Sequence, residues 1–137
     1  MSKLITVYQQ LEYQEKRSKQ NVPALIKIRK QASKLKNLLE SEKISLIEIG
    51  ELINDGWELK KTLSHNISNE KINKAYEESI SIGAYGGKLF GAGGGGFLAF
   101  IAEPKNHQNI TKSMTKYNFI KINFNFEDKG AVICGNF

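Results

Sequence analysis

A run of glycines between residues 83 and 96 is the part of this sequence with the clearest chemical meaning. Eight of the twelve glycines lie in these fourteen residues, and Gly93 to Gly96 are consecutive. Each glycine in ordered structure costs about 0.5–1 kcal/mol relative to alanine, so a physical need must offset the cost. That need is either a positive φ angle in a tight turn or a bare backbone whose N–H groups approach a ligand, most often a phosphate. Because Lys88 lies five residues before the four glycines, we expect a loop that faces an anionic ligand; the alternative is a glycine-rich hairpin with no ligand.

Two common phosphate-binding motifs do not fit this stretch. Gly91, Gly93 and Gly96 have the spacing G-x-G-x-x-G, but the dinucleotide motif opens a helix, whereas residues 97–102 are an apolar run typical of a buried strand. Residues 83–89 do not form a P-loop either, because their glycines are one residue too close together and a leucine follows the lysine where Ser or Thr is required.

Length and composition indicate one domain in a reducing compartment. A chain of 137 residues can bury a core without disulfides or metal, and the single cysteine, Cys134, excludes an internal disulfide. We expect Cys134 to be a small buried side chain on the last strand. His65 and His107 are isolated from other metal-binding side chains, so we predict no metal site. No apolar stretch approaches the ~18 residues of a membrane span and no signal peptide is visible, so we expect a cytoplasmic protein without a membrane partner.

The net charge of +6 is unevenly distributed along the chain. No acidic residue lies between Glu15 and Glu40, whereas eight basic residues do. These are Lys16, Arg17, Lys19, Lys27, Arg29, Lys30, Lys34 and Lys36. Such a field attracts phosphorylated small molecules, nucleic acid or an acidic protein, and the alternative is a solvated helix face. Because no aromatic residues are interleaved with these charges, we do not expect a nucleic-acid partner.

Helices are expected through the first 83 residues. Residues 1–20 are mostly polar and indicate a helix only weakly, so this segment has no firm assignment. A helix is predicted from Val22 to Glu40, with Pro23 in its first turn. Ser45 and Glu48 then have the spacing of a capping box before a second helix that ends near residue 63 and lies antiparallel to the first.

The third helix and the glycine run mark the change to β-structure. Ser68 is expected to cap the third helix, and Gly83 to end it. The elements expected after it are a strand at 86–90, a loop at 91–95, a central strand at 97–102, a helix at 104–117, a strand at 120–126 and a last strand at 131–134. The predicted fold class is therefore α+β, with N-terminal antiparallel helices packed on a four-strand, mostly antiparallel sheet.

One further group of residues could do chemistry. Trp57 is followed on neighbouring helical turns by Lys60 and Lys61. Trp57 can be a core anchor, or it can line a substrate cleft in which Lys60 meets the charge of an anion.

Taken together, these residues resemble the C-terminal domain of the GHMP small-molecule kinases, the superfamily of galactokinase, homoserine kinase and mevalonate kinase. The sequence Gly-Gly-Lys-Leu-Phe-Gly-Ala-Gly-Gly-Gly-Gly-Phe-Leu, residues 86–98, is similar to the third conserved motif of that superfamily. Residues 57–61, 67–69 and 83–89 are similar to the branch that phosphorylates D-glycero-D-manno-heptose 7-phosphate for cell-surface polysaccharide precursors. The resemblance implies a ferredoxin-like C-terminal domain at residues 21–137.

The resemblance also implies a site at a domain boundary. It assigns a nucleotide- or substrate-binding loop to Gly86, Gly87, Lys88, Gly91, Ala92, Gly93, Gly94, Gly95 and Gly96. Members of the superfamily bind ATP and Mg²⁺ chiefly through an N-terminal domain whose phosphate loop contains Gly-Ser-Ser, and no Gly-Ser-Ser occurs here. The chain is therefore expected to lack the ATP-binding domain, to hold neither ATP nor Mg²⁺ tightly, and to be inactive alone, with no catalytic residue assigned.

Two functions stay open on this basis. The first is the C-terminal part of a sugar-phosphate kinase, which works on sugar phosphate and ATP together with the absent domain. The second is a non-catalytic domain that binds phosphorylated sugars or regulates a full-length kinase. In either case, apolar surface left bare by the absent domain could support a homodimer.

Overall fold

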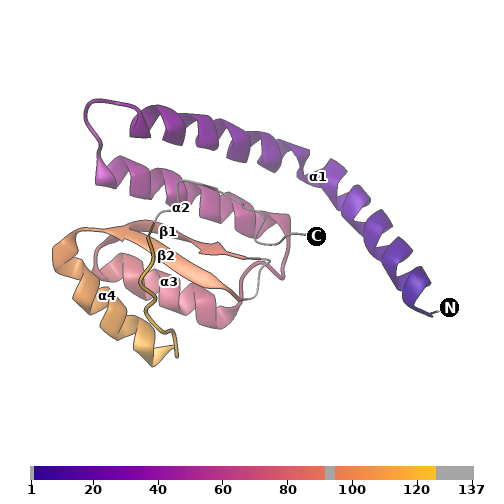
Figure 1. The fold of residues 1–137 in the computed structure, drawn as a ribbon. Helices are drawn as coiled ribbons and strands as arrows, with labels where there is room; N and C mark the ends of the chain where they lie inside the picture. The colour runs from indigo at the N-terminus through magenta and orange to yellow at the C-terminus, as the bar shows by residue number, and fades with distance from the viewer. Residues whose placement is uncertain (1, 92–94, 126–137) are drawn as a thin grey trace, which may run out of the picture.

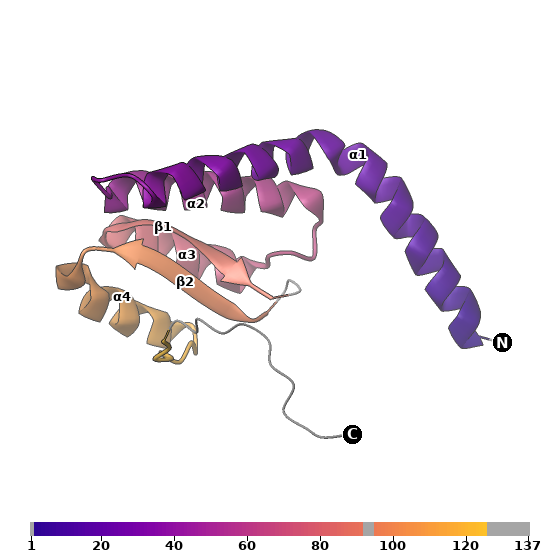
Figure 2. The same cartoon turned by 45° about the horizontal axis from the view of Figure 1, so that its top comes forward.

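The computed structural model describes residues 2–91 and 95–125, which form four helices and a β-hairpin. The elements are α1 (Ser2–Leu39), α2 (Leu46–Leu63), α3 (Glu70–Ile82), β1 (Ala84–Phe90), β2 (Phe97–Ala102) and α4 (Pro104–Lys116). Figures 1 and 2 show α1 alongside α2, and α2 next to the hairpin, with α3 and α4 adjacent to each other on its other side. The described part of the chain is thus α+β, as expected.

The first helix is longer than the sequence pattern predicted. It runs without a break from Ser2 to Leu39, so the predicted start at Val22 is wrong and Pro23 lies in its interior. A proline inside a helix removes one backbone hydrogen bond and crowds the preceding turn, which bends the helix. α1 bends about halfway along its length, and its N-terminal half leads away from the other elements (Figures 1 and 2).

The second helix is capped and paired as predicted. Ser45 is its N-cap, and the Ser45 hydroxyl accepts the backbone N–H of Glu48 at 3.3 Å. α1 and α2 lie antiparallel, and the side-chain amide of Asn21 donates to the carbonyl oxygen of Leu63 at 3.1 Å. Because the last carbonyl groups of a helix have no partner within it, Asn21 joins α1 to the C-terminal end of α2.

The basic residues of α1 lie on a solvated helix face. The six of them whose side chains are described are all exposed: Lys19, Lys27, Arg29, Lys30, Lys34 and Lys36. The four apolar and small residues of this stretch that turn toward α2 (Ala24, Ile28, Leu35 and Leu38) are half-buried. The charge therefore stays at the protein surface, where it shapes the field around α1.

The cap of the third helix differs from the prediction. The N-cap is Asn69 and not Ser68, and the Asn69 side-chain oxygen accepts the N–H of Ile72 at 2.9 Å. Asn69 directly precedes the first helical residue, so its side chain reaches the N–H three residues on. At the other end, Gly83 has a φ of 112°, in the left-handed region that favours glycine, and closes the helix as predicted.

The sheet has two strands in the described part of the chain. β1 and β2 pair antiparallel, with Leu89 opposite Leu98 and Phe90 opposite Phe97. β1 begins at Ala84 and not at Gly86, whereas β2 has the predicted bounds.

The predicted third strand does not form within residues 120–125. The alternating side chains of Ile120, Ile122 and Phe124 are exposed by 87, 56 and 73 %, and no strand is present there. Alternation gives a strand only where a sheet edge and an apolar surface receive it. Residue 126 and the last predicted strand, at 131–134, lie outside the described residues, so the four-strand sheet and the central place of β2 are not shown.

The core joins α2, α3 and the hairpin. Trp57, Ile72, Tyr76 and Leu89 form one buried cluster. Ala84, Ala102 and Ile110 form a second, which fixes α4 on the hairpin. None of the helices in the described range is long and apolar enough to cross a lipid bilayer.

A carboxylate fastens α4 to α3. Glu78 accepts hydrogen bonds from Lys116 Nζ and from the hydroxyl of Tyr117, each at 2.7 Å. These bonds, with that of Lys116 first, lower the pKa of Glu78 to about 2. Because this pKa lies below its ordinary value, the carboxylate stabilises the fold above about pH 4.5, and its contribution is lost as the pH falls toward 2.

We therefore expect Glu78→Gln to lower the urea midpoint at pH 7, and to have progressively less effect as the pH falls below 4. Urea unfolding of both proteins at pH 7 and pH 3, followed by circular dichroism, measures the difference. Glu77→Gln is the matched control, because Glu77 is the exposed neighbour on the same helix. An equal loss at both pH values would contradict the prediction.

Candidate functional site

The loop that joins β1 and β2 needs glycine at both of its ends. Gly91 has a φ of 128° and Gly96 a φ of 125°, which side chains rarely allow. A Cβ on Gly96 would lie 2.2 Å from the carbonyl oxygen of Phe90, and one on Gly91 would lie 3.1 Å from that of Gly95. These two glycines are therefore explained by the turn itself. Ala92, Gly93 and Gly94 lie outside the described residues.

Gly95 differs from the glycines on either side of the loop. A Cβ built on it would meet no atom of the described residues within 4 Å. Packing against the described part of the chain therefore does not require glycine at this position. An exposed backbone without a side chain is what a close approach by a ligand needs.

Gly86 and Gly87 lie in the buried part of β1 and not in the loop. A Cβ on Gly86 would lie 1.9 Å from the carbonyl oxygen of Gly50 in α2, so the two backbones touch here. A Cβ on Gly87 would lie 2.4 Å from the carbonyl oxygen of Ala99. The sequence grouped both with the loop, but their contacts give them a packing role, Gly86 against α2 and Gly87 against β2.

The charge of Lys88 lies close to the loop on a face of the hairpin that carries two aromatic rings. Its ammonium is 4.9 Å from the ring centroid of Phe90, and Phe90 faces Phe97 across the strands. Phe90 and Phe97 are exposed by 49 and 63 %. The face therefore offers a cation and two rings, which suits a ligand with both anionic and apolar parts.

Trp57 and Lys60 have different roles in the structure. Trp57 is 1 % exposed, so it is the core anchor, the first of the two roles that the sequence left open. Lys60 Nζ donates to the carbonyl oxygen of Leu89 at 3.4 Å, on the edge of β1 away from β2 and near the loop. The structure therefore brings Lys60 to the strand that leads into the loop, and Trp57 belongs to the same buried cluster as Leu89 of that strand.

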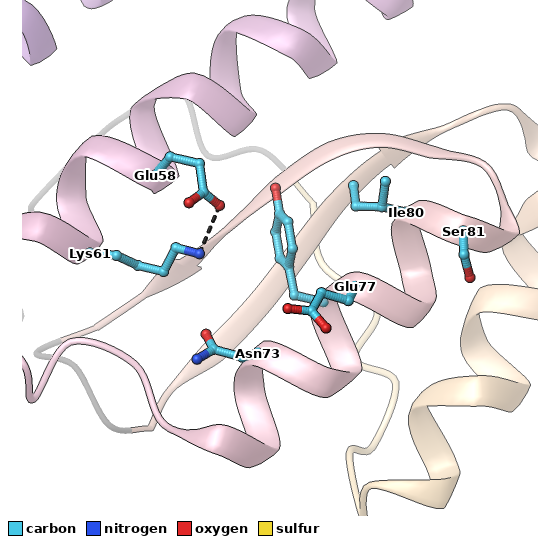
Figure 3. Close-up of a pocket in the computed structure, with 7 residues that line it drawn as sticks. Glu58, Lys61, Asn73, Glu77, Ile80 and Ser81 are labelled. Atoms are coloured by element: carbon cyan, nitrogen blue, oxygen red, sulfur yellow. Dashed lines mark ion pairs between the residues drawn. The ribbon is translucent and has the colours of Figure 1, made fainter.

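A cavity of about 390 Å³ lies between α2 and α3, away from the glycine loop. It is lined by Glu58, Lys61, Asn73, Tyr76, Glu77, Ile80 and Ser81. Figure 3 shows Lys61 turned toward Glu58, with 2.7 Å between the ammonium and the carboxylate. Lys61 is thus paired inside this cavity, and neither Trp57 nor Lys60 lines it.

Sequence reasoning missed a buried hydroxyl that holds β1. The hydroxyl of Tyr76 accepts the N–H of Gly87 at 3.1 Å, donates to the Asn54 side-chain oxygen at 2.7 Å, and has the Gly87 carbonyl oxygen as a second acceptor at 3.2 Å. Burial is the main cause that raises the pKa of Tyr76 to about 12. The sequence signal for such a contact was the position of Tyr76 on an apolar helix face. A tyrosine there is buried, and a buried hydroxyl requires hydrogen-bond partners.

The hairpin and its flanking helices lie in the part of the chain that matches a known protein family. Residues 34–120 match the family model of the GHMP kinases C terminal, a range that contains α2, α3, the glycine loop and α4. The chain belongs to the GHMP kinase C-terminal family.

Two curated relatives are kinases that act on sugars, according to their names. The D-glycero-alpha-D-manno-heptose 7-phosphate kinase of Campylobacter jejuni subsp. jejuni serotype O:2 is 30 % identical over 111 residues, which are 81 % of this chain and 32 % of that enzyme. The bifunctional fucokinase/GDP-fucose pyrophosphorylase of Arabidopsis thaliana is 39 % identical over 56 residues, 41 % of this chain and 5 % of that enzyme. The chain thus spans about a third of the Campylobacter kinase.

Proposed function

We propose that this chain is the C-terminal part of an ATP-dependent sugar-phosphate kinase that acts in the cytoplasm on D-glycero-D-manno-heptose 7-phosphate. The observation that carries the proposal is the identity of 30 % to the Campylobacter heptose 7-phosphate kinase over 81 % of this chain. The family match around the glycine loop supports the kinase class, because Gly95 in that loop has an exposed backbone and Lys88 lies on the adjoining strand.

The described residues fit part of a phosphate site. Gly95 leaves its backbone open, and Lys88 adds positive charge on the adjoining strand. When bound, ATP supplies the phosphoryl group, and transfer depends on positioning and charge neutralisation around it. In this proposal Gly95 allows close approach of a phosphate, and Lys88 offsets part of its charge.

The described part of the chain does not fit Mg²⁺. It contains no group of three or more His, Cys, Asp or Glu side chains that could hold a metal ion. In a working kinase the metal and most phosphate contacts would come from the remainder of the enzyme, and the isolated chain is expected to be inactive.

A chimaera tests the proposal. The matched C-terminal part of the Campylobacter kinase is replaced by residues 20–137 of this chain, and phosphorylation of D-glycero-α-D-manno-heptose 7-phosphate by ATP is followed by phosphorus NMR. We expect turnover by the chimaera and none by this chain alone. Lys88→Ala in the chimaera is expected to raise the KM for substrate or ATP, and Lys105→Ala, an exposed lysine on α4, is the matched control.

Three results would contradict the proposal. A folded chimaera without turnover would remove the kinase assignment, and binding of the heptose phosphate by that protein would then favour a non-catalytic sugar-phosphate domain. Turnover of other sugar phosphates, but not of this one, would remove the proposed substrate. Turnover by the isolated chain would show that no further domain is required.

A further inference from the structure

The turn between α1 and α2 exposes apolar side chains that no described element covers. Leu39, Ile44, Leu46 and Ile47 lie within nine residues of sequence and are exposed by 53, 58, 41 and 49 %. We call these four residues the turn patch. They lie where α1 ends and α2 begins, at the end of α2 opposite to the glycine loop (Figure 1).

The turn patch is distant from the kinase site proposed above. The N-terminal part of α2 touches the start of β1, through Gly50 and Gly86, whereas Lys60 near the other end of α2 reaches Leu89 beside the loop. A partner on the turn patch would therefore leave the glycine loop free. Binding at the turn patch therefore does not compete with binding at the glycine loop.

The charges around the turn patch have both signs. Lys36 and Lys43 are accompanied by Glu40, Glu42 and Glu48, and Lys36 lies 3.8 Å from Glu40. Two other exposed apolar groups of the described residues differ in this respect. Val22, Leu25 and Ile26 lie on the basic part of α1, and Ile120 and Ile122 flank Lys121, with no carboxylate from residue 118 to residue 125.

This difference decides which surface suits a second copy of the chain. In a twofold dimer the same surface meets itself, so a surface of one sign repels its copy, whereas a mixed rim can place lysine against glutamate. With a net charge of +6, two copies repel each other over most of their surface. The turn patch combines apolar contact with a rim that is complementary to itself.

We propose that the turn patch is the contact of a homodimer. Four apolar side chains and their rim are small beside the ~800 Å² per partner of a standard interface. The dimer is therefore weak and forms reversibly with concentration. Salt screens both the repulsion between the two basic chains and the lysine–glutamate pairs of the rim, so the apolar contact is the part that persists at high salt.

Sedimentation velocity of the full chain over a hundredfold range of concentration tests the proposal. We expect a monomer–dimer equilibrium that shifts at least tenfold toward monomer with Ile44→Asp. Ile47→Glu should have the same effect, and it favours folding because an acidic residue in the first turn suits the helix dipole. Ile120→Asp is the matched control, since it makes the same change at an exposed isoleucine outside the patch, and it should leave the equilibrium unchanged.

The proposal is overturned if the chain stays monomeric at every concentration and salt level. It is equally overturned if Ile120→Asp dissociates the dimer while both patch variants leave it intact, because the contact would then involve another surface. Circular dichroism of each variant shows whether it is folded. Neither result bears on the kinase proposal, whose test uses the chimaera.

Discussion

Replacing Gly86 with alanine is expected to lower the free energy of unfolding by about 3 kcal/mol, the upper end of what an added methyl group typically costs in a packed core. A Cβ at this position would lie 1.9 Å from the carbonyl oxygen of Gly50 and 2.6 Å from its carbonyl carbon. Both atoms belong to the backbone of α2, so no side-chain rotation relieves the overlap. α2 must move away from β1, which opens the core around Trp57 and Leu89.

Urea unfolding followed by circular dichroism measures this loss, and Gly95→Ala is its matched control. Gly95 belongs to the same glycine run, but an added Cβ there meets none of the described atoms within 4 Å. We expect Gly95→Ala to leave the free energy of unfolding within about 0.5 kcal/mol of that of the original protein. Equal losses at the two positions would show that the glycines matter through chain flexibility and not through the contact of α2 with β1.

Replacing Tyr76 with phenylalanine is expected to lower the free energy of unfolding by about 1–3 kcal/mol. The change removes one oxygen atom and leaves the ring in place against Trp57 and Phe100. The N–H of Gly87 then loses the acceptor that the structure gives it, in a position closed to water. Tyr85→Phe, which removes a half-buried hydroxyl bonded to Glu103 at 3.2 Å, is the matched control and should have a smaller effect.

Tyr76→Phe should also change how the free energy of unfolding depends on pH in alkaline solution. The pKa of Tyr76 is raised to about 12, mainly by burial, from its ordinary value near 10. The unfolded chain therefore loses this proton first, and stability that is fully present below pH 10 declines as the pH rises toward 12. Unfolding at pH 8, 10 and 11 should show a smaller decline for Tyr76→Phe than for the original protein, and parallel declines would contradict the assigned pKa.

The sequence predicted the elements whose signals are local. Ser45 as a cap, Gly83 as the end of a helix and the bounds of β2 all depend on residues close in the chain, and the structure confirms them. The predicted start of the first helix at Val22 was wrong, because a proline that suits a first helical turn can also lie inside a long helix at the cost of a bend.

The parts that failed depend on what lies next to a segment in space. Residues 120–125 have the alternation of a strand but no strand neighbour in the described part of the structure, and alternation cannot supply one. Likewise, Gly86 looked like part of a ligand loop until its contact with Gly50 was visible, 36 positions away in sequence. The loop glycines 91 and 96 were predictable as turn residues, whereas the partners of the Tyr76 hydroxyl were not, because they come from two other elements, Asn54 from α2 and Gly87 from β1.

The covered outer edge of β1 also restricts how this protein can aggregate. Tyr76 occupies both backbone groups of Gly87, and Lys60 occupies the carbonyl oxygen of Leu89, so an incoming strand finds these groups already bonded. Within the described hairpin, strand addition then has only the β2 side available. In an amyloid-like fibre every unit pairs with one neighbour on each side, so each unit needs two open strand edges. A hairpin closed on one side can end in a pair, but it cannot propagate as a fibre while α2 and α3 stay folded against it.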